Sequence, residues 1–365
     1  MKYGLSHLPV TDCHVHMRGT VDSMVNCAAI MEANKLRGMN IVCVPQLTNE
    51  QLTLNPVAML FKLMHPDQAY VFGGLRYPVD GLRAAKKNDF VDQVKAMMRM
   101  GMDGVKMIEG KPTVRKRIGV PLNDPAYHDY YAYLEAEGIP VLLHVGDPWI
   151  FWHEATIPQY AREREWMYTD GSFPDNESLY RESEAVLEEF PGLKVIFAHF
   201  YFLNSDRERA DAFLNRWPNV SFDLTPGIEM FPDFSQDYDA WRELFVKHQD
   251  QIILGTDNSG EPRAPNPANV ARGLYRLYQV RNFLECDHEF QCWESTARGF
   301  ALEEPVLEKI YAGNFARYAG ESPKKPDAGL ILQDCEKAIS LATGCSAETL
   351  SELHRIRSHV KTFCD

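Results

Sequence analysis

The sequence has little that would mark a membrane, disulfide-rich or nucleic-acid-binding protein. It contains no run of about 18 apolar residues, so we expect no membrane span. Its eight cysteines form no Cys-x-x-Cys pair, which argues against a zinc ribbon or a thioredoxin-like site and favours free thiols. The net charge of −13 argues against nucleic-acid binding. The opening stretch has neither an apolar run nor a small-residue cleavage site, so we expect a mature, cytoplasmic protein.

A glycine-rich fingerprint after the first predicted strand is also missing, which argues against a dinucleotide-binding open sheet. Short apolar runs instead alternate with helix-length stretches, and some of these stretches end in glycine, as residues 89–101 do. Eight runs are typical of strands buried on both faces: residues 10–17, 39–47, 69–77, 103–110, 139–147, 193–200, 219–227 and 251–260. This alternation predicts an α/β fold, specifically a closed (β/α)8 TIM barrel.

Two parts of the chain fall outside this alternation. Residues 149–172 are long and aromatic, and we predict that they form a lid or a pocket wall. The sequence after residue 320 has a helical pattern. We therefore predict a barrel domain over residues 1–320 and a helical C-terminal extension over residues 321–365 that packs on it.

The stretch VTDCHVHMRG places His14 and His16 one residue apart on the first predicted strand. Side chains two residues apart share one face of a strand, so both imidazoles should point the same way. Two neutral imidazoles on one face can bind a transition metal. A hydrogen-bonded pair of histidines is the alternative, and this stretch alone leaves it open.

Three further residues of ligand type end predicted strands. His144, His199 and Asp257 lie late in the fifth, sixth and eighth strands, and in a barrel these ends meet at the catalytic rim. Singly, each histidine could be a hydrogen-bonded core residue, and the aspartate could cap the next helix. Together with the pair on the first strand they favour a site for Zn²⁺, Fe²⁺, Mn²⁺ or Co²⁺.

The motifs DCHVHM, VLLHVGD, VIFAHF and IILGTD, followed by KIYAGNFARYAG, resemble the amidohydrolase superfamily. The similarity lies in the branch that includes aminocarboxymuconate semialdehyde decarboxylase-like enzymes, and it spans roughly residues 8–320. It implies a divalent metal, with Zn²⁺ as the first choice, held by four residues: His14, His16, His144 and Asp257. It also implies that Asp257 handles the proton of the activated water.

The resemblance leaves two roles for His199, as a ligand of a second metal or as a catalytic group. Lys106, on the fourth strand, stands where some members of the superfamily carry a carboxylated lysine that bridges two metals. A cation for an acidic substrate, or a pair with Glu109, are the alternatives for Lys106. Arg76 could hold a substrate carboxylate through a bidentate pair, with a salt bridge to a rim acid as its alternative.

The basic stretch from Lys111 to Arg117 is predicted as a loop at the same rim, and with Arg76 and Lys106 it favours a small anionic substrate. The chemistry is that of a metal-dependent hydrolase of an amide, ester or lactone bond, in which a metal lowers the pKa of water to about 7. A non-oxidative decarboxylase of an unsaturated or aromatic carboxylic acid is the alternative on the same ligands. The resemblance further implies a homodimer or larger assembly.

Overall fold

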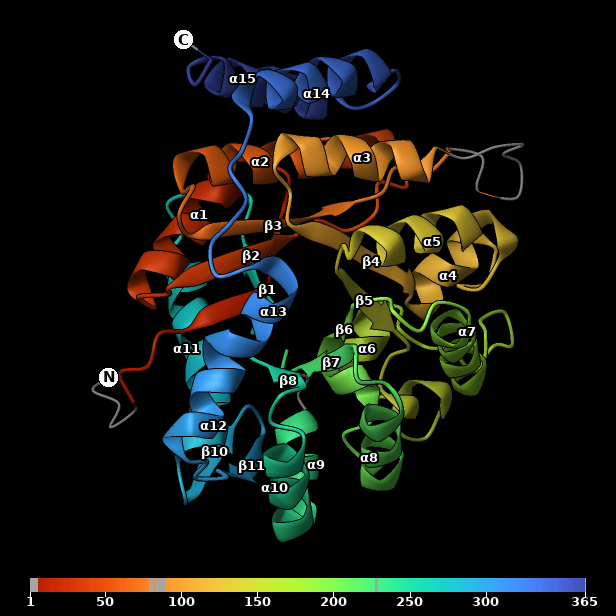
Figure 1. The fold of residues 1–365 in the computed structure, drawn as a ribbon, viewed down its shortest axis with the longest axis vertical. Helices are drawn as coiled ribbons and strands as arrows, with labels where there is room; N and C mark the ends of the chain where they lie inside the picture. Colours follow the sequence, from red (N-terminus) through yellow and green to blue (C-terminus); the bar gives the residue numbers. More distant parts are fainter. Residues whose placement is uncertain (1–5, 79–81, 83–88, 227–228, 365) are drawn as a thin grey trace.

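A parallel β-sheet forms the centre of the computed structural model, which describes residues 6–78, 82, 89–226 and 229–364. Its nine strands follow the order β8-β7-β6-β5-β4-β3-β2-β1-β9 and curl into a barrel (Figure 1). The strands are β1 (Thr11–Met17), β2 (Gly38–Val42), β3 (Ala69–Gly74), β4 (Gly104–Gly110), β5 (Val141–Val145), β6 (Val195–Phe197), β7 (Val220–Asp223), β8 (Ile252–Ile253) and β9 (Asn258–Gly260). The predicted TIM barrel is confirmed. The end of the seventh predicted run, Gly227, lies outside the described residues.

The barrel closes through its eighth predicted run, which the structure divides into two strands. β8 pairs with β7, and β9 pairs with β1, where Val15 lies opposite Asn258. Between the two strands, the backbone N–H of Cys13 donates to the carbonyl of Leu254 at 3.1 Å. One segment therefore joins the first strand to the seventh and completes the ring.

Helices surround the sheet in the order that the alternation predicts. α3 ends at Gly101 with φ 94°, a left-handed conformation that glycine adopts without strain, as predicted for this stretch. The helices are α1 (Val21–Ala33), α2 (Leu54–Met64), α3 (Phe90–Met100), α4 (Pro112–Ile118), α5 (His128–Glu137), α6 (Gln159–Glu163), α7 (Asn176–Glu189), α8 (Arg207–Arg216), α9 (Met230–Gln236), α10 (Tyr238–Lys247), α11 (Pro267–Glu285), α12 (Glu304–Glu308), α13 (Asn314–Ala319), α14 (Ala328–Leu341) and α15 (Ala347–Lys361). A short hairpin of β10 (Glu289–Cys292) and β11 (Ser295–Arg298) follows α11.

Apolar side chains fill the barrel interior at one end. The residues that pack there are Cys13, Val42, Phe72, Leu142, Ile196 and Ile253, together with Phe315 and Ala319 of α13. Asn314, which begins α13, donates to the carbonyl of Ile252 at 2.8 Å and so ties this helix to the strand it covers. Because this end is packed, the polar groups of the interior lie toward the carboxyl ends of the strands, where barrel enzymes carry their sites.

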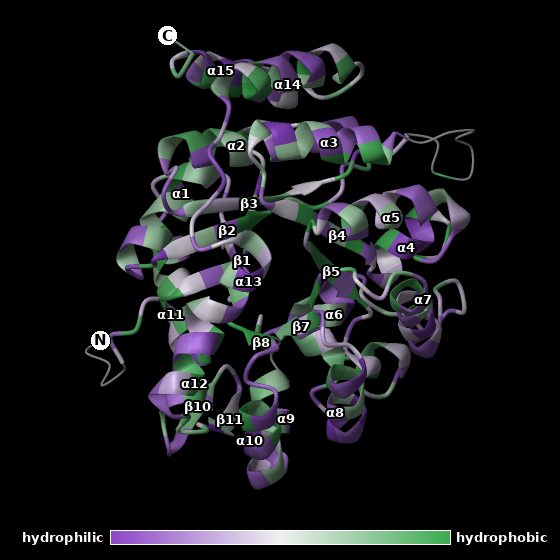
Figure 2. Ribbon diagram, viewed as in Figure 1, coloured by the Kyte–Doolittle hydropathy of each residue, from purple (hydrophilic) through white to green (hydrophobic). Residues whose placement is uncertain are grey.

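The C-terminal helices α14 and α15 form a pair outside α2 and α3 (Figure 1). Both helices mix hydrophobic and hydrophilic residues along their length (Figure 2), and their buried residues include Ile331, Leu353 and Ile356. The barrel with C-terminal helices is thus confirmed, while the domain boundary at residue 320 stays a prediction. All eight cysteines, each of them described, are free thiols. Among the described helices, none has the length and apolarity that crossing a bilayer requires.

Candidate metal and catalytic site

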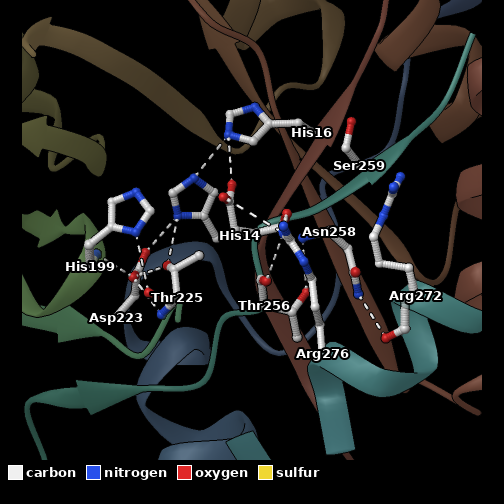
Figure 3. Close-up of polar contacts among 12 residues, drawn as sticks. His14, His16, His199, Asp223, Thr225, Thr256, Asn258, Ser259, Arg272 and Arg276 are labelled. Atoms are coloured by element: carbon white, nitrogen blue, oxygen red, sulfur yellow. Dashed lines mark hydrogen bonds and ion pairs between the residues drawn. The ribbon is translucent and has the colours of Figure 1, made fainter. Parts of the chain in front are cut away.

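His14 and His16 lie side by side in the barrel mouth. The His14 ring is buried, whereas the side chain of His16 is 24% exposed. Their Nε2 atoms are 3.2 Å apart, so the two rings share a face as strand alternation predicts (Figure 3). The register of β1 against β2 shifts between Asp12 and Val15, and strands use such irregularities to redirect side chains near active sites.

Asp257 completes a compact group with these two histidines. It follows β8 with φ 53°, a left-handed conformation that is uncommon for a residue with a side chain. Its carboxylate Oδ1 lies 3.3 Å from Nε2 of His16, and its backbone N–H donates to the carbonyl of His14 at 3.0 Å. One ligand atom from each of the three residues lies within 4.8 Å of the others. Two imidazole nitrogens and a carboxylate oxygen are a donor set that fits Zn²⁺ and related divalent metals.

Arg276 of α11 supports Asp257 from outside the group. Its Nη1 donates to the backbone carbonyl of Asp257 and lies 3.7 Å from the carboxylate Oδ2 (Figure 3). Burial by itself would raise the pKa of Asp257, but His16 and Arg276 outweigh it and hold this pKa well below its usual range. Asp257 is therefore a carboxylate at neutral pH. Arg276 could not be identified from the sequence, because an arginine on a helix usually faces solvent.

Asp223, at the end of β7, is a second carboxylate of the site. Its Oδ2 accepts a hydrogen bond from Nδ1 of His14 at 2.7 Å, and its Oδ1 accepts one from the backbone N–H of His199 at 2.8 Å (Figure 3). Burial alone would raise the pKa of Asp223, but the charge and hydrogen bond of His14 hold it well below its usual range. Because Nδ1 of His14 carries the proton, Nε2 presents its lone pair to the site.

Sequence reasoning did not single out Asp223, although a usable signal was present. The residue lies within the seventh predicted run, residues 219–227, as His144 lies within the fifth and Asp257 within the eighth. Applied evenly to all eight strands, that positional rule would have included Asp223.

His199 lies beside His14, with ring centroids 5.6 Å apart. Its Nδ1 lies 3.2 Å from the carbonyl oxygen of Thr225, which can only accept, so Nδ1 carries the proton and Nε2 holds the lone pair. Burial, with a smaller contribution from the charge of His144, lowers the pKa of His199 to about 4. At neutral pH the ring is therefore uncharged, and its Nε2 can accept a proton or bind a metal.

His144 lies next to His199, at a ring-centroid distance of 4.9 Å, but outside the compact group of His14, His16 and Asp257. Its Nε2 donates to the carbonyl of Gly146 at 2.9 Å, so its lone pair is on Nδ1. Its role as a metal ligand stays a prediction.

Lys106 is buried inside the barrel with its Nζ 3.2 Å from Nε2 of His14. Burial lowers the pKa of this amine to about 8, although the charges of Asp223 and Asp257 act in the opposite direction. Glu109, the alternative partner from the sequence, instead accepts a hydrogen bond from the hydroxyl of Tyr77 at 2.7 Å. The structure therefore brings Lys106 to the histidines.

The other predicted cations have acidic or backbone neighbours. The charge of Arg76 partly offsets the effect of burial, which raises the pKa of Asp334 of α14, and the role of Arg76 toward a substrate carboxylate stays a prediction. Residues 111–117 were expected as a loop, but they form helix α4, which begins at Pro112 because proline suits the first turn of a helix. Lys111 pairs with Asp147 at 2.6 Å and Arg115 with Glu182 at 2.9 Å, so two cations of this stretch are neutralised by acids. The positive wall stays a prediction.

A closed parallel barrel with histidines and carboxylates at its strand ends defines a TIM-barrel enzyme. The sequence model of the family Amidohydro_2, described as amidohydrolase, matches residues 80–318. The chain therefore belongs to the amidohydrolase superfamily, in the branch that includes aminocarboxymuconate semialdehyde decarboxylase-like enzymes. This match begins after β1, so His14 and His16 lie outside it. A search of curated proteins found no match.

Solved structures share the fold at low sequence identity. A proposed amidohydrolase from Staphylococcus aureus has a TM-score of 0.55 at 13% identity, over 86% of this chain and 100% of its own. An uncharacterized TIM-barrel protein from Bordetella bronchiseptica has a TM-score of 0.50 at 15% identity, over 86% and 99%. The 2,6-dihydroxybenzoate decarboxylase from Rhizobium has a TM-score of 0.50 at 12% identity, over 86% and 98%.

Proposed function

We propose that the protein is a metal-dependent hydrolase that cleaves an amide, ester or lactone bond of a small, carboxylated substrate. The observation that carries this proposal is the compact group of His14, His16 and Asp257 at the open end of the barrel. When bound, a divalent metal, with Zn²⁺ as the first choice, would polarise the scissile carbonyl and activate the attacking water.

The histidines would hold the metal through the nitrogen whose lone pair is set by the hydrogen bond of the other ring nitrogen. Asp223 accepts a hydrogen bond from Nδ1 of His14, so the lone pair of that ring is on Nε2, which is a common arrangement of a carboxylate behind a ligating histidine. His144 would join through Nδ1, since Gly146 occupies its other nitrogen. The charged carboxylate of Asp257 would complete the set.

Proton transfer falls to Asp257 in this proposal. Its side chain is 32% exposed, so water reaches a carboxylate that is ionised at neutral pH. It would accept the proton of the attacking water and pass it to the leaving group. His199 would act as an acceptor or as a ligand of a second metal, because its Nε2 carries no proton in the observed arrangement. The donor available for a developing oxyanion is the ammonium of Lys106.

A second candidate is non-oxidative decarboxylation of an unsaturated or aromatic carboxylic acid. The observation that favours it is the position of Lys106, whose ammonium next to His14 could hold a substrate carboxylate beside the metal ligands. The shared fold with the 2,6-dihydroxybenzoate decarboxylase makes an aromatic acid worth including among the substrates tested.

The experiment is an assay of a panel of lactones, amides, esters and aromatic acids in ¹⁸O-labelled water, with metal content measured on the same preparation. Hydrolysis should place ¹⁸O in the organic product, whereas CO₂ release with no ¹⁸O in the organic product would favour the second candidate. Asp257→Asn should lower turnover by at least 100-fold through loss of the proton acceptor. Asp129→Asn, at a side chain that is 95% exposed, is the control and should leave turnover unchanged.

A further inference from the structure

Asp147, two residues beyond the end of β5, has no role in the site described so far, yet it is only 3% exposed. Its carboxylate accepts hydrogen bonds from three side chains. Nζ of Lys111 lies 2.6 and 2.8 Å from its two oxygens, the hydroxyl of Tyr168 lies 2.5 Å from Oδ2, and Nε2 of His144 lies 3.3 Å from Oδ1. These donors come from the start of α4, from residues 149–172 and from β5. One buried carboxylate thus joins three separate parts of the chain.

The contact with His144 bears on the orientation of its ring. The N–H at Nε2 lies between the carbonyl of Gly146 and Oδ1 of Asp147, so both groups act on the same proton. A histidine whose one nitrogen is held in this way presents the other nitrogen in a fixed direction. Asp147 therefore influences where the free Nδ1 of His144 points.

The contact with Tyr168 bears on residues 149–172, which we call the β5–α7 segment. This segment has an apolar cluster of its own, formed by Phe151, Ile157, Ala161 and Tyr168. Its Trp166 lies 4.3 Å below Nζ of Lys111, the residue that also pairs with Asp147. The segment is thus attached near the site through a hydroxyl and a cation–π contact that both lead to the Asp147–Lys111 pair.

We propose that Asp147 is a positioning residue that couples the orientation of His144 to the docking of the β5–α7 segment beside the site. The two carboxylate oxygens of Asp147 have different partners, since Oδ1 contacts His144 and Oδ2 contacts Tyr168. Lys111 donates to both oxygens. Loss of the Tyr168 hydroxyl, the partner of Oδ2, releases the β5–α7 segment. Loss of the Asp147 charge releases both this segment and the imidazole ring of His144. This coupling makes the access of substrate to the site depend on the carboxylate of Asp147. The statement about substrate access rests on the proposed function.

Three variants separate these contacts. Tyr168→Phe removes one hydroxyl and keeps the aromatic ring in its cluster, and Asp147→Asn removes the charge at nearly constant shape. Tyr160→Phe is the control, because it lies in the same segment and its hydroxyl has no hydrogen-bond partner among the described residues. None of the three changes a predicted metal ligand.

The first measurement needs no substrate. Brief trypsin treatment of the purified holoprotein should cut after the exposed Arg164 of the segment. We expect cleavage there to be at least 5-fold faster in Tyr168→Phe and in Asp147→Asn than in the wild type and in Tyr160→Phe. Cleavage of both variants at the wild-type rate would overturn the docking role, and acceleration spread over the whole chain would overturn it as well.

The second measurement divides the two contacts kinetically. Tyr168→Phe should raise KM by about 3- to 10-fold with kcat nearly unchanged, whereas Asp147→Asn should also lower kcat by at least 10-fold. Equal kcat in the two variants would overturn the role toward His144. If no substrate of the panel is turned over, the proposed function is contradicted, while the trypsin result still decides the docking role. If Asp147→Asn does not fold, the comparison of trypsin cleavage rates between Tyr168→Phe and Tyr160→Phe decides the docking role.

Discussion

At the scale of single residues, the nitrogens that face away from the barrel mouth decide how the histidines behave. The proton on Nδ1 of His14 is held by Asp223, and the proton on Nδ1 of His199 by the carbonyl of Thr225. Each bond assigns the lone pair to the nitrogen that faces the site. The orientation of the His14 and His199 rings therefore depends on the acceptors behind them, which are the carboxylate of Asp223 and the carbonyl of Thr225.

Substitution of the first-strand histidines should remove the metal with different effects on stability. His16→Ala should lose bound metal and remain folded, because this side chain is partly exposed and its contacts are with site groups. His14→Ala should lose metal and about 2–3 kcal/mol of stability, because Oδ2 of the buried Asp223 loses the hydrogen bond from Nδ1 of His14, while Oδ1 keeps the one from the backbone of His199. Native mass spectrometry and thermal unfolding check both. Full metal content in both variants would contradict the assignment.

Lys106→Met tests whether the buried amine recognises a carboxylate. The substitution keeps the volume and removes the cation beside His14, so KM for acidic substrates should rise by at least 10-fold while neutral substrates change little. Metal content measured in parallel should stay at one ion per chain. Two ions per chain in the wild type, with reconstitution that depends on CO₂, would instead identify a bridging carboxylated lysine.

Glu109→Gln should stabilise the protein at neutral and alkaline pH and have no such effect near pH 4. One oxygen of Glu109 accepts from Tyr77, and the other has no partner among the described residues. Burial raises its pKa to about 7 from a model-peptide value of 4.5. The unfolded chain therefore releases this proton first, so stability declines from pH 4.5 to 7 and stays reduced above. Removing the titration should stabilise the protein by about 3 kcal/mol at pH 8 and by nothing near pH 4, as measured by calorimetry. A gain of equal size at both pH values would contradict this.

At the scale of elements, the C-terminal helices belong to the packed body of the protein. α15 buries Leu353 completely against neighbours that include Leu52, and Glu50 accepts hydrogen bonds from Ser346 at the start of the same helix. The carboxylate of Glu352 also accepts from the backbone N–H of Val21, at the start of α1. Helix α15 therefore contacts two segments of the barrel, the start of α1 after the first strand and residues 50–52 after the second strand.

Leu353→Ala should lower the free energy of unfolding by about 2–4 kcal/mol, because it opens a cavity between α15 and the barrel. Leu350→Ala is the control on the same helix, since that side chain is 36% exposed, and it should change stability by less than about 0.5 kcal/mol. Calorimetry should show one transition that shifts as a whole. A separate early transition in Leu353→Ala would mean that residues 321–365 unfold as an independent unit.

The strands could be predicted because each is a short apolar run buried on both faces, and the barrel followed from their alternation with helices. The division of the eighth run into two strands could not be predicted, because it depends on the left-handed backbone at Asp257 and on pairing with β1.

Helix α4 has two helix signals in its sequence, a proline at its start and Gly119 at its end, but its run of charged residues favours the prediction of a loop. The positions of His144, His199 and Asp257 followed from the strand ends. Their hydrogen-bond partners did not, because Asp223 is 209 residues from His14 in sequence.

At the scale of the whole molecule, the net charge of −13 opposes the approach of an anionic substrate. Two cations at α4 do not offset this, since Lys111 pairs with Asp147 and Arg115 with Glu182. Lys106 acts only at close range, because it lies buried inside the barrel. The long-range field and the local cation therefore act in opposite directions on a carboxylate.

Salt should consequently assist an acidic substrate. Raising the ionic strength from about 10 to about 150 mM shortens the Debye length to about 8 Å and screens the distant acids more than the buried contact. We expect kcat/KM for a carboxylated substrate to rise by about 2- to 5-fold and that of a neutral analogue to stay constant. A fall for the acidic substrate would mean that a local positive surface governs its approach.

The ring closure between β9 and β1 also has a consequence for the order in which the site forms. His14 lies near the start of the chain, while Asp223 and Asp257 follow more than 200 residues later. Such distant contacts carry a large loop-closure entropy and form late in folding. During synthesis the histidines leave the ribosome long before the carboxylates that orient them, so a nascent chain has no complete site until the eighth strand has emerged. If the site binds a metal as proposed, metal uptake would report that the ring has closed, and an unfinished chain would not retain the ion.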